Sequence, residues 1–399
     1  MRSDVFPSHA AYPRSQNGQI GSLNKMMRQG TEHRLSGQAS VRTSSTRQAG
    51  PFFGAIDLGT NNCRLMIAAG TANGFRVVDS FNRSVRLGEG LRLSGRLAEE
   101  SMTRALDALR ICVERMKQWP LSHVRAVATE ACRKAANGRE FLERVQSEIG
   151  LTIDIITARE EAELALESCS PLFRVPSHAP ARAERGVLFD IGGGSTEVAW
   201  VRVDQARKSQ TLIGTTSMPV GVITLQEMFG EGHGSSYEEM VSYVQSHLAD
   251  FENIHRIRRE ITQGNACLLG TSGTVTTLAG VALSLPRYNR AAIDGLTLPG
   301  DVMREAINTL RGLSRNHLSA HPCVGEDRVK YVLPGCAIFE AIHRAWPIEE
   351  VTIADRGLRD GMLLRMARDH GQRFTRERRR PYRHVTPRSR GPLGNYATI

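Results

Sequence analysis

Several patterns that would place a chain in a common class are absent from these 399 residues. There is no Gly-x-x-x-x-Gly-Lys-Ser/Thr, which excludes a P-loop, and no Gly-x-Ser-x-Gly of the kind that carries a nucleophilic serine. No apolar stretch reaches membrane-spanning length, and the N-terminus has no signal-peptide hydrophobic core. The seven cysteines are scattered without a Cys-x-x-Cys. We expect reduced core cysteines and a cytoplasmic protein without membrane contact.

Acidic residues are scarce at both ends, so the net charge of +11 is concentrated there. Residues 1–50 hold seven Lys/Arg and two acids, and residues 371–399 hold eight Arg and one acid. The body between them is nearly neutral, so the high pI does not indicate a nucleic-acid-binding fold. We expect a disordered basic extension over 1–50 and a disordered Arg-rich tail over 371–399. The alternative is that the tails contact RNA or another polyanion.

What is present is one strand–turn–strand pattern that occurs twice. Asp57-Leu-Gly-Thr-Asn-Asn-Cys-Arg-Leu65 is matched by Asp190-Ile-Gly-Gly-Gly-Ser-Thr-Glu-Val198. Each copy ends one apolar run and opens another. Glycines let backbone N–H groups converge on an anion, and an aspartate can hold a cation beside it. Two such turns facing each other would hold a metal–phosphate unit from both sides.

Apolar periodicity predicts an α/β fold of two similar halves. In the first half we expect strands near 52–57, 63–69, 75–85, 123–129 and 152–157, with helices at 98–118, at 139–149 and from 159. In the second half we expect strands near 187–190, 195–203, 210–218, 266–270 and 351–354, with helices at 221–229, 236–260, 275–283 and 357–369. This order is typical of ribonuclease-H-like domains. It predicts domains at 51–165 and 166–370, a surface loop at 168–185, and an active site in the cleft between the domains.

Three further features are candidates for chemistry, each with a simpler explanation. Arg64 and Glu197 occupy the same place in the two repeats, where they could bind phosphate and Mg²⁺ or form ordinary strand ion pairs. The turn Gly270–Thr274 precedes a helix and could bind an anion or be an ordinary Ser/Thr cap. Glu160 and Glu161 open a helix, where acids also stabilise the helix dipole without any catalytic task.

Seven segments occur in the order found in one family, which they resemble. They are Asp57–Leu65, Arg86–Leu91, Ala128–Arg133, Glu160–Ala162, Asp190–Glu197, Gly270–Thr274 and Gly357–Gly361. The family is that of exopolyphosphatases and guanosine pentaphosphate phosphohydrolases (Ppx/GppA), in the actin–hexokinase–chaperone superfamily. The resemblance covers about residues 52–370 and is to the short, two-domain form. It implies an actin-like ATPase fold and hydrolysis of a terminal phosphoanhydride with Mg²⁺ or Mn²⁺.

The resemblance also implies roles for individual residues. Glu161 is the expected general base, Asp190 and Glu197 are expected to act with it in catalysis, and Asp57, Asp190 and Glu197 are the expected metal ligands. The expected phosphate-binding residues are Gly59, Thr60, Asn61, Arg64, Gly192, Gly193, Gly194, Ser195, Thr196, Gly273, Thr274 and Arg359. A homodimer is also expected.

The function predicted from the sequence is therefore a hydrolase that releases the terminal phosphate of inorganic polyphosphate. Guanosine pentaphosphate presents the same terminal phosphoanhydride and is the alternative substrate. Two other classes stay open. A superfamily kinase would transfer phosphate to an acceptor other than water, and a non-catalytic regulator would use a nucleotide only as a switch.

Overall fold

The computed structural model describes residues 50–71, 74–173, 184–204, 206–207 and 209–378, with side chains through Gly371. These residues belong to one compact unit, Ala49–Ile399. The predicted N-terminal extension, the centre of the predicted 168–185 loop and the tail beyond Arg378 lie outside the described residues.

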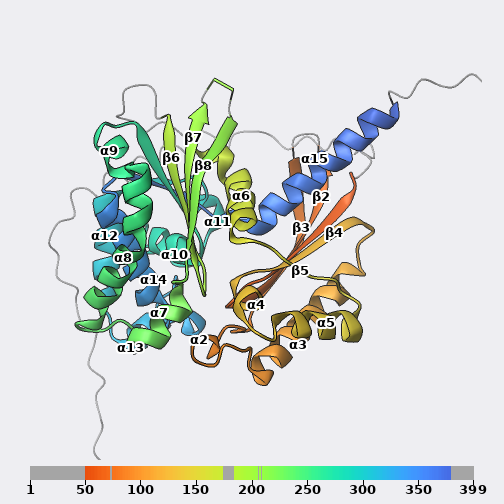
Figure 1. Ribbon diagram of the computed structural model, residues 1–399, viewed down its shortest axis with the longest axis horizontal. Helices are drawn as coiled ribbons and strands as arrows, with labels where there is room; N and C mark the ends of the chain where they lie inside the picture. Colours follow the sequence, from red (N-terminus) through yellow and green to blue (C-terminus); the bar gives the residue numbers. More distant parts are fainter. Residues whose placement is uncertain (1–49, 72–73, 174–183, 205, 208, 379–399) are drawn as a thin grey trace, which may run out of the picture. The chain divides into compact units, whose positions relative to one another are not determined.

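The first sheet contains five strands in the order β3-β2-β1-β4-β5 (Figure 1). The strands are β1 (Phe52–Leu58), β2 (Asn62–Thr71), β3 (Gly74–Ser84), β4 (Leu121–Ala128) and β5 (Asp154–Ile155). β1 pairs antiparallel with β2 and parallel with β4, so it lies at the centre of the sheet. Its residues from Phe53 to Asp57 are all buried, as expected for a strand covered on both faces.

The second sheet repeats this topology and adds one strand. Its order is β10-β11-β9-β6-β7-β8. The strands are β6 (Arg185–Ile191), β7 (Thr196–Asp204), β8 (Ser209–Met218), β9 (Ala266–Thr271), β10 (Thr297–Pro299) and β11 (Glu350–Ala354). Read from the other edge, the spatial order β8-β7-β6-β9-β11 corresponds strand by strand to β3-β2-β1-β4-β5 of the first sheet. Strand β10 is an additional strand at the edge. The predicted α/β class with two ribonuclease-H-like halves is confirmed, whereas the domain boundaries stay a prediction.

Helices cover the sheets. They are α2 (Leu91–Ser94), α3 (Glu99–Met116), α4 (Glu130–Lys134), α5 (Gly138–Ile149), α6 (Ala158–Cys169), α7 (Val222–Phe229), α8 (Ser236–His255), α9 (Ile257–Thr262), α10 (Gly273–Ala282), α11 (Arg290–Ile293), α12 (Gly300–Arg311), α13 (Arg315–Ala320), α14 (Val332–Ala345) and α15 (Leu358–Arg378). Two short 3₁₀ turns lie at Ser170–Leu172 and Glu326–Arg328. No helix within the described ranges is long and apolar enough to cross a membrane.

One helix, α6, packs against both sheets. Its Leu164 belongs to a cluster with Phe53 of the first sheet and Met362 of α15. Its Leu166 and Cys169 belong to a different cluster, formed with the second sheet. The opposite face of the first sheet is covered by α3 and α5, and that of the second by α8, α10, α12 and α14. The first turn of α6, which carries Glu160 and Glu161, is therefore fixed relative to both repeats.

The structure corrects three predicted boundaries. The helix expected over 236–260 is two helices, because Arg256 between them adopts a left-handed conformation with φ of 51°. The helix expected to end at 369 continues to Arg378, so residues 371–378 are helical rather than part of a disordered tail. The loop expected from 168 begins later, since α6 runs to Cys169 and a 3₁₀ turn follows. All seven cysteines are free and buried, as predicted.

Candidate active site

The two aspartate hairpins have the same turn geometry. The Gly59 amide donates a hydrogen bond to the Asn62 carbonyl at 2.9 Å, and the Gly192 amide donates to the Ser195 carbonyl at 2.9 Å. In the first hairpin Asp57 lies opposite Arg64 across the strand pair. In the second, Asp190 lies opposite Glu197. The repeat seen in the sequence is thus a repeat of backbone structure with opposite charges at the equivalent position.

The two turns face each other in direct contact. A methyl group at Gly193 would lie 3.1 Å from the Asn61 amide nitrogen and 3.2 Å from Thr60 Cβ. A methyl group at Gly194 would lie 2.8 Å from Thr60 Oγ1. The second turn is also fixed from behind, because the Ile223 amide of α7 donates to the Gly193 carbonyl at 2.8 Å. Glycine at 193 and 194 therefore permits the close approach of the two hairpins.

Four carboxylates gather at these turns, Asp57 and Glu197 buried and Asp190 and Glu161 partly exposed, and their pKa values are raised. Burial raises the pKa of Asp190 to about 6 and that of Glu197 to about 7. Burial also raises the pKa of Asp57, against the opposing effect of Arg64 and Arg359. The pKa of Glu161 lies well above its usual range because of burial and then the Glu197 charge, with smaller effects from Asp57 and Asp190. Excess negative charge in a buried site favours a bound cation.

The residues of the first hairpin fit a divalent cation. The Oδ1 atom of Asp57 is buried and has no hydrogen-bond partner among the described residues, while Oδ2 lies 4.0 Å from Arg64 Nη1. No group of three His, Cys, Asp or Glu side chains within the described ranges forms a complete metal cluster. Mg²⁺ commonly uses one or two carboxylates and completes its shell with water and phosphate oxygens. An unpartnered carboxylate oxygen beside a glycine turn suits that mode of binding.

Glu197 is held in place by two serines. Ser195 Oγ and Ser217 Oγ donate hydrogen bonds to its Oε1 at 2.6 Å and 2.9 Å. The Ser195 hydroxyl, predicted to bind phosphate, therefore contacts Glu197 here. The Thr196 hydroxyl, another predicted phosphate ligand, donates to the Val220 carbonyl at 2.6 Å. Ser217, on β8, has no motif around it and was not predicted.

The adjacent acids of α6 are separated by the structure. The Glu160 amide donates to the Thr157 hydroxyl at 3.1 Å in an N-terminal cap, and its carboxylate pairs with Arg125 of β4. Glu161 Oε2 instead accepts hydrogen bonds from Arg133 at 3.3 Å and 3.4 Å and lies within the influence of the hairpin carboxylates. The Glu160 carboxylate is thus occupied by an ion pair at the start of the helix, whereas Glu161 lies near the hairpin carboxylates.

Two further arginines, Arg328 and Arg359, lie near Arg64 of the first hairpin. Burial and the neighbouring Arg64 lower the pKa of Arg359 and also that of Arg328. Among the described residues neither Arg328 nor Arg359 forms an ion pair with a carboxylate, although Arg328 Nη1 donates to Thr277 Oγ1 at 3.0 Å. Arginines brought together without carboxylate partners suit an anion, and the planar guanidinium suits phosphate. Arg328 was missed because its sequence context contains no phosphate-binding pattern.

The third glycine turn caps helix α10. Ser272 adopts φ of 121°, and its hydroxyl accepts from the Thr274 amide at 3.2 Å, which is the capping explanation considered above. The Thr274 side chain lies against α14, because a methyl group at Gly335 would be 2.5 Å from its Oγ1. A methyl group at Gly273 would be 3.7 Å from Arg328 Cζ, so Gly273 faces the arginine group. Phosphate binding by Gly273 and Thr274 stays a prediction.

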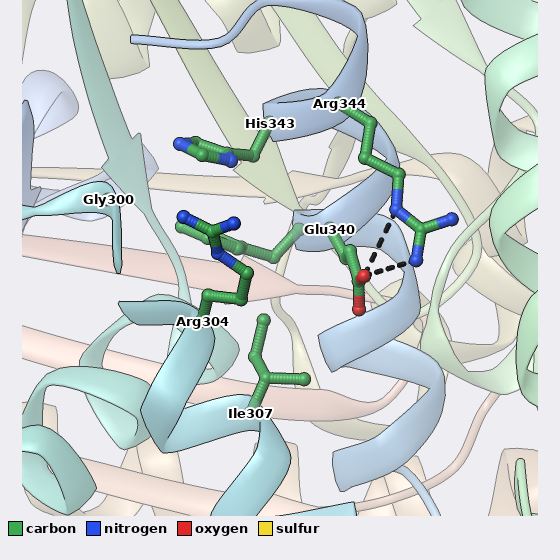
Figure 2. Close-up of a pocket in the computed structure, with 7 residues that line it drawn as sticks. Gly300, Arg304, Ile307, Glu340, His343 and Arg344 are labelled. Carbon is green, nitrogen blue, oxygen red and sulfur yellow. Dashed lines mark hydrogen bonds and ion pairs between the residues drawn. The ribbon is translucent and has the colours of Figure 1, made fainter. Parts of the chain in front are cut away.

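A cavity of about 250 Å³ lies elsewhere, between α12 and α14 (Figure 2). Arg304 and His343 project into it, and Arg344 lies against Glu340 with Nε donating at 3.0 Å. Burial lowers the pKa of His343. The cavity shares no lining residue with the aspartate hairpins, and its Arg344–Glu340 pair is already neutralised. We therefore assign the chemistry to the hairpins.

The fold is that of an actin-like protein in which two aspartate hairpins face each other. The sequence profile of the Ppx/GppA phosphatase family matches residues 66–370, and the chain belongs to this family. A guanosine-5'-triphosphate,3'-diphosphate pyrophosphatase of Photobacterium profundum is 28% identical over 331 residues, 82% of this chain and 62% of that protein. A Haemophilus influenzae protein with a provisional exopolyphosphatase name is 27% identical over 319 residues, 79% of this chain and 91% of that protein.

Solved structures show the same fold. An exopolyphosphatase-like protein matches with a TM-score of 0.69 and 26% identity, over 82% of this chain and 99% of that one. An exopolyphosphatase from Cytophaga hutchinsonii matches with a TM-score of 0.68 over 80% of this chain and 98% of that one. Its identity of 23% supports likeness of fold alone. This chain spans 62% of the Photobacterium relative, so it corresponds to about three fifths of that longer protein.

Proposed function

We propose that this protein is a phosphohydrolase that releases the terminal phosphate of inorganic polyphosphate. The observation that carries the proposal is the direct apposition of the two aspartate turns, with Thr60 and Asn61 against Gly193 and Gly194. The carboxylates Asp57, Asp190 and Glu197 lie at these turns, and Arg328 and Arg359 lie near Arg64 of the first. A terminal phosphate needs both, because its negative charge must be neutralised while water attacks.

The arginine side would bind the phosphate chain. Burial and then the Arg64 charge lower the pKa of both Arg328 and Arg359, so a bound anion would relieve the repulsion between the arginines. Their guanidinium groups can each contact two phosphate oxygens. The chain would enter with its terminal phosphate beside the two turns.

The carboxylate side would activate water. Glu161 would accept a proton from water as the water oxygen bonds to the terminal phosphorus, and the bond to the bridging oxygen would break to release the shortened chain. A general base is most effective with a pKa near the working pH, and the raised pKa of Glu161 moves it in that direction. Glu197, fixed by Ser195 and Ser217, would hold the attacking water in line.

A divalent cation, Mg²⁺ or Mn²⁺, would be held by Asp57, Asp190 and Glu197 and would neutralise charge on the phosphate oxygens. The unpartnered Oδ1 of Asp57 supports its role as a ligand. The identity of the cation, a homodimeric state and cytoplasmic location remain predictions.

Guanosine pentaphosphate is the second candidate substrate. The Photobacterium relative has a guanosine-5'-triphosphate,3'-diphosphate pyrophosphatase name, and the match to it covers 82% of this chain. The decisive experiment measures phosphate release from long polyphosphate, tripolyphosphate and guanosine pentaphosphate side by side, with and without Mg²⁺. Release from none of the three would reject the hydrolase and favour a kinase or a non-catalytic regulator.

The role of Glu161 can be tested by Glu161→Gln, with the adjacent Glu160→Gln as a matched control. Glu161→Gln should lower kcat by roughly 10²–10⁴-fold, because a general base contributes about that much. Glu160→Gln should retain near-normal kcat, because Glu160 pairs with Arg125 instead. The reverse result would transfer the role to Glu160.

A further inference from the structure

Glu130 is a buried carboxylate beside the candidate site that has no task in the reaction proposed above. It opens α4 and is only 8% exposed. It lies at the second aspartate turn, since a methyl group at Gly194 would be 3.4 Å from Glu130 Cγ. Burying a carboxylate is unfavourable unless a cation or hydrogen bonds compensate it. The group that compensates the Glu130 charge therefore indicates what Glu130 does.

That partner is Arg133, which Glu130 shares with Glu161. Arg133 Nη2 and Nε donate to Glu130 Oε2 at 2.6 Å and 3.1 Å. Arg133 Nη1 donates to the Ile156 carbonyl at 2.8 Å. The contacts to Glu161 Oε2 are longer, at 3.3 Å and 3.4 Å. The guanidinium thus lies closer to Glu130 and the backbone than to Glu161, although it still donates two hydrogen bonds to Glu161 and is influenced by its charge.

This unequal sharing matters because Glu161 must accept a proton. Burial and the Glu197 charge raise the pKa of Glu161 most, and Arg133 lowers it, with smaller raising effects from Asp57 and Asp190. An arginine that closed fully on Glu161 would occupy its oxygens and weaken it as a base. The distances show that Glu130 competes for that arginine.

We propose that Glu130 is a positioning residue that holds Arg133 away from Glu161, so that the Glu161 carboxylate stays available to take the proton from water. The inference rests on the proposed hydrolase function and adds a residue to it. It also assigns Arg133 a restrained position rather than a direct role in the reaction.

The first test is Glu130→Gln, which keeps the size of the side chain and removes its charge. Arg133 should then move onto Glu161, and kcat on tripolyphosphate should fall by roughly 10-fold, since an arginine beside a carboxylate lowers its pKa by about 1–3 units. KM should change by less than about 2-fold, because the arginines that bind phosphate are untouched. Glu130→Asp, which retains the charge, should keep kcat closer to that of the unaltered protein. Glu163→Gln, in an exposed pair with Arg159 on α6, is the control and should leave kcat unchanged.

The second test adds Arg133→Met to Glu130→Gln. If released Arg133 is what harms Glu161, the double variant should have a higher kcat than Glu130→Gln alone. A purely structural role for the pair predicts the opposite, because removing both partners would add damage or leave it unchanged. Unaltered kcat in Glu130→Gln, or no recovery in the double variant, would overturn the inference. Absence of phosphate release from the unaltered protein would instead count against the proposed function.

Discussion

The two aspartate hairpins share one backbone but differ in the residue opposite the aspartate. In the first hairpin Arg64 lies opposite Asp57, and burial together with the Arg64 charge lowers the pKa of Arg328 and Arg359 nearby. In the second, Glu197 lies opposite Asp190 and is fixed by two serine hydroxyls. One turn geometry therefore serves two purposes. Under the proposed function, the hairpin with Arg64 would serve phosphate, and the hairpin with Glu197 would serve water and metal.

The comparison is tested most severely by Glu197→Gln, which removes the charge that distinguishes the second hairpin. We expect kcat to fall by roughly 10²-fold or more, because oriented charges act mainly on the transition state. KM for tripolyphosphate should change little. Phosphate release at saturating substrate measures the effect, and Glu239→Gln on the exposed face of α8 is a control. A change in KM alone would show that Glu197 binds substrate rather than assisting attack.

Arg64→Ala tests the first hairpin and should affect KM rather than kcat. We expect KM to rise by about 10- to 100-fold, as for loss of a hydrogen bond to a charged group, worth about 1.5–3 kcal/mol. The KM of Arg64→Lys should lie between those of the unaltered protein and Arg64→Ala, because a lysine keeps the charge but not the planar guanidinium. Steady-state kinetics with tripolyphosphate measures this, with the exposed Arg76→Ala of β3 as control. If Arg64→Ala lowered kcat as Glu197→Gln does and left KM unchanged, the division between the hairpins would be wrong.

Contact between the hairpins can be tested by Gly194→Ala. The new methyl group would lie 2.8 Å from Thr60 Oγ1 and 3.1 Å from Thr60 Cγ2. Overpacking of this kind typically destabilises by about 1–3 kcal/mol. Gly59→Ala is the matched variant in the first turn, where the nearest atom is 3.4 Å away, and it should be milder. Urea unfolding compares the two, and equal effects would argue that the hairpins are further apart.

The smallest expected effect is on the pH dependence of stability without divalent cations. Burial raises the pKa of Glu197 from 4.5 to about 7 and that of Asp190 from 3.8 to about 6. Between those values the folded protein binds more protons than the unfolded chain, so its free energy of unfolding should fall as pH rises from about 4 through about 7. Glu197→Gln should flatten the upper part of this decline. Urea unfolding in a chelator at several pH values measures it, and stability rising across this window would contradict the assignment.

Local patterns predicted much of the fold because they reflect local physics. The apolar runs on either side of Asp57 and Asp190 became the central strands of two sheets. The helical spacing over 98–118 became α3 at Glu99–Met116. The break at Arg256 was missed because a non-glycine residue carries the left-handed conformation, for which the sequence has no signal.

The candidate site was predictable only in part. Glycine-rich turns and the acids of α6 are visible in the sequence, but the choice between Glu160 and Glu161 is not. Arg328 and Ser217 were missed because each comes from a segment without a motif and reaches the site through packing. Arg133 lies in the Ala128–Arg133 motif, but no role was predicted for it. The contacts of these three residues depend on where α4, β8 and the 3₁₀ turn at Glu326–Arg328 lie in space.

The order of strands and turns, and the presence of two equivalent aspartate hairpins, follow from the residue pattern alone, since glycine, carboxylate and apolar alternation act over a few neighbouring positions. Which acid of α6 points inward, which arginines lack a carboxylate, and how Arg133 is divided between Glu130 and Glu161 were decided by tertiary structure. Burial and charge at a point depend on every segment that packs there, and those segments are distant in the chain.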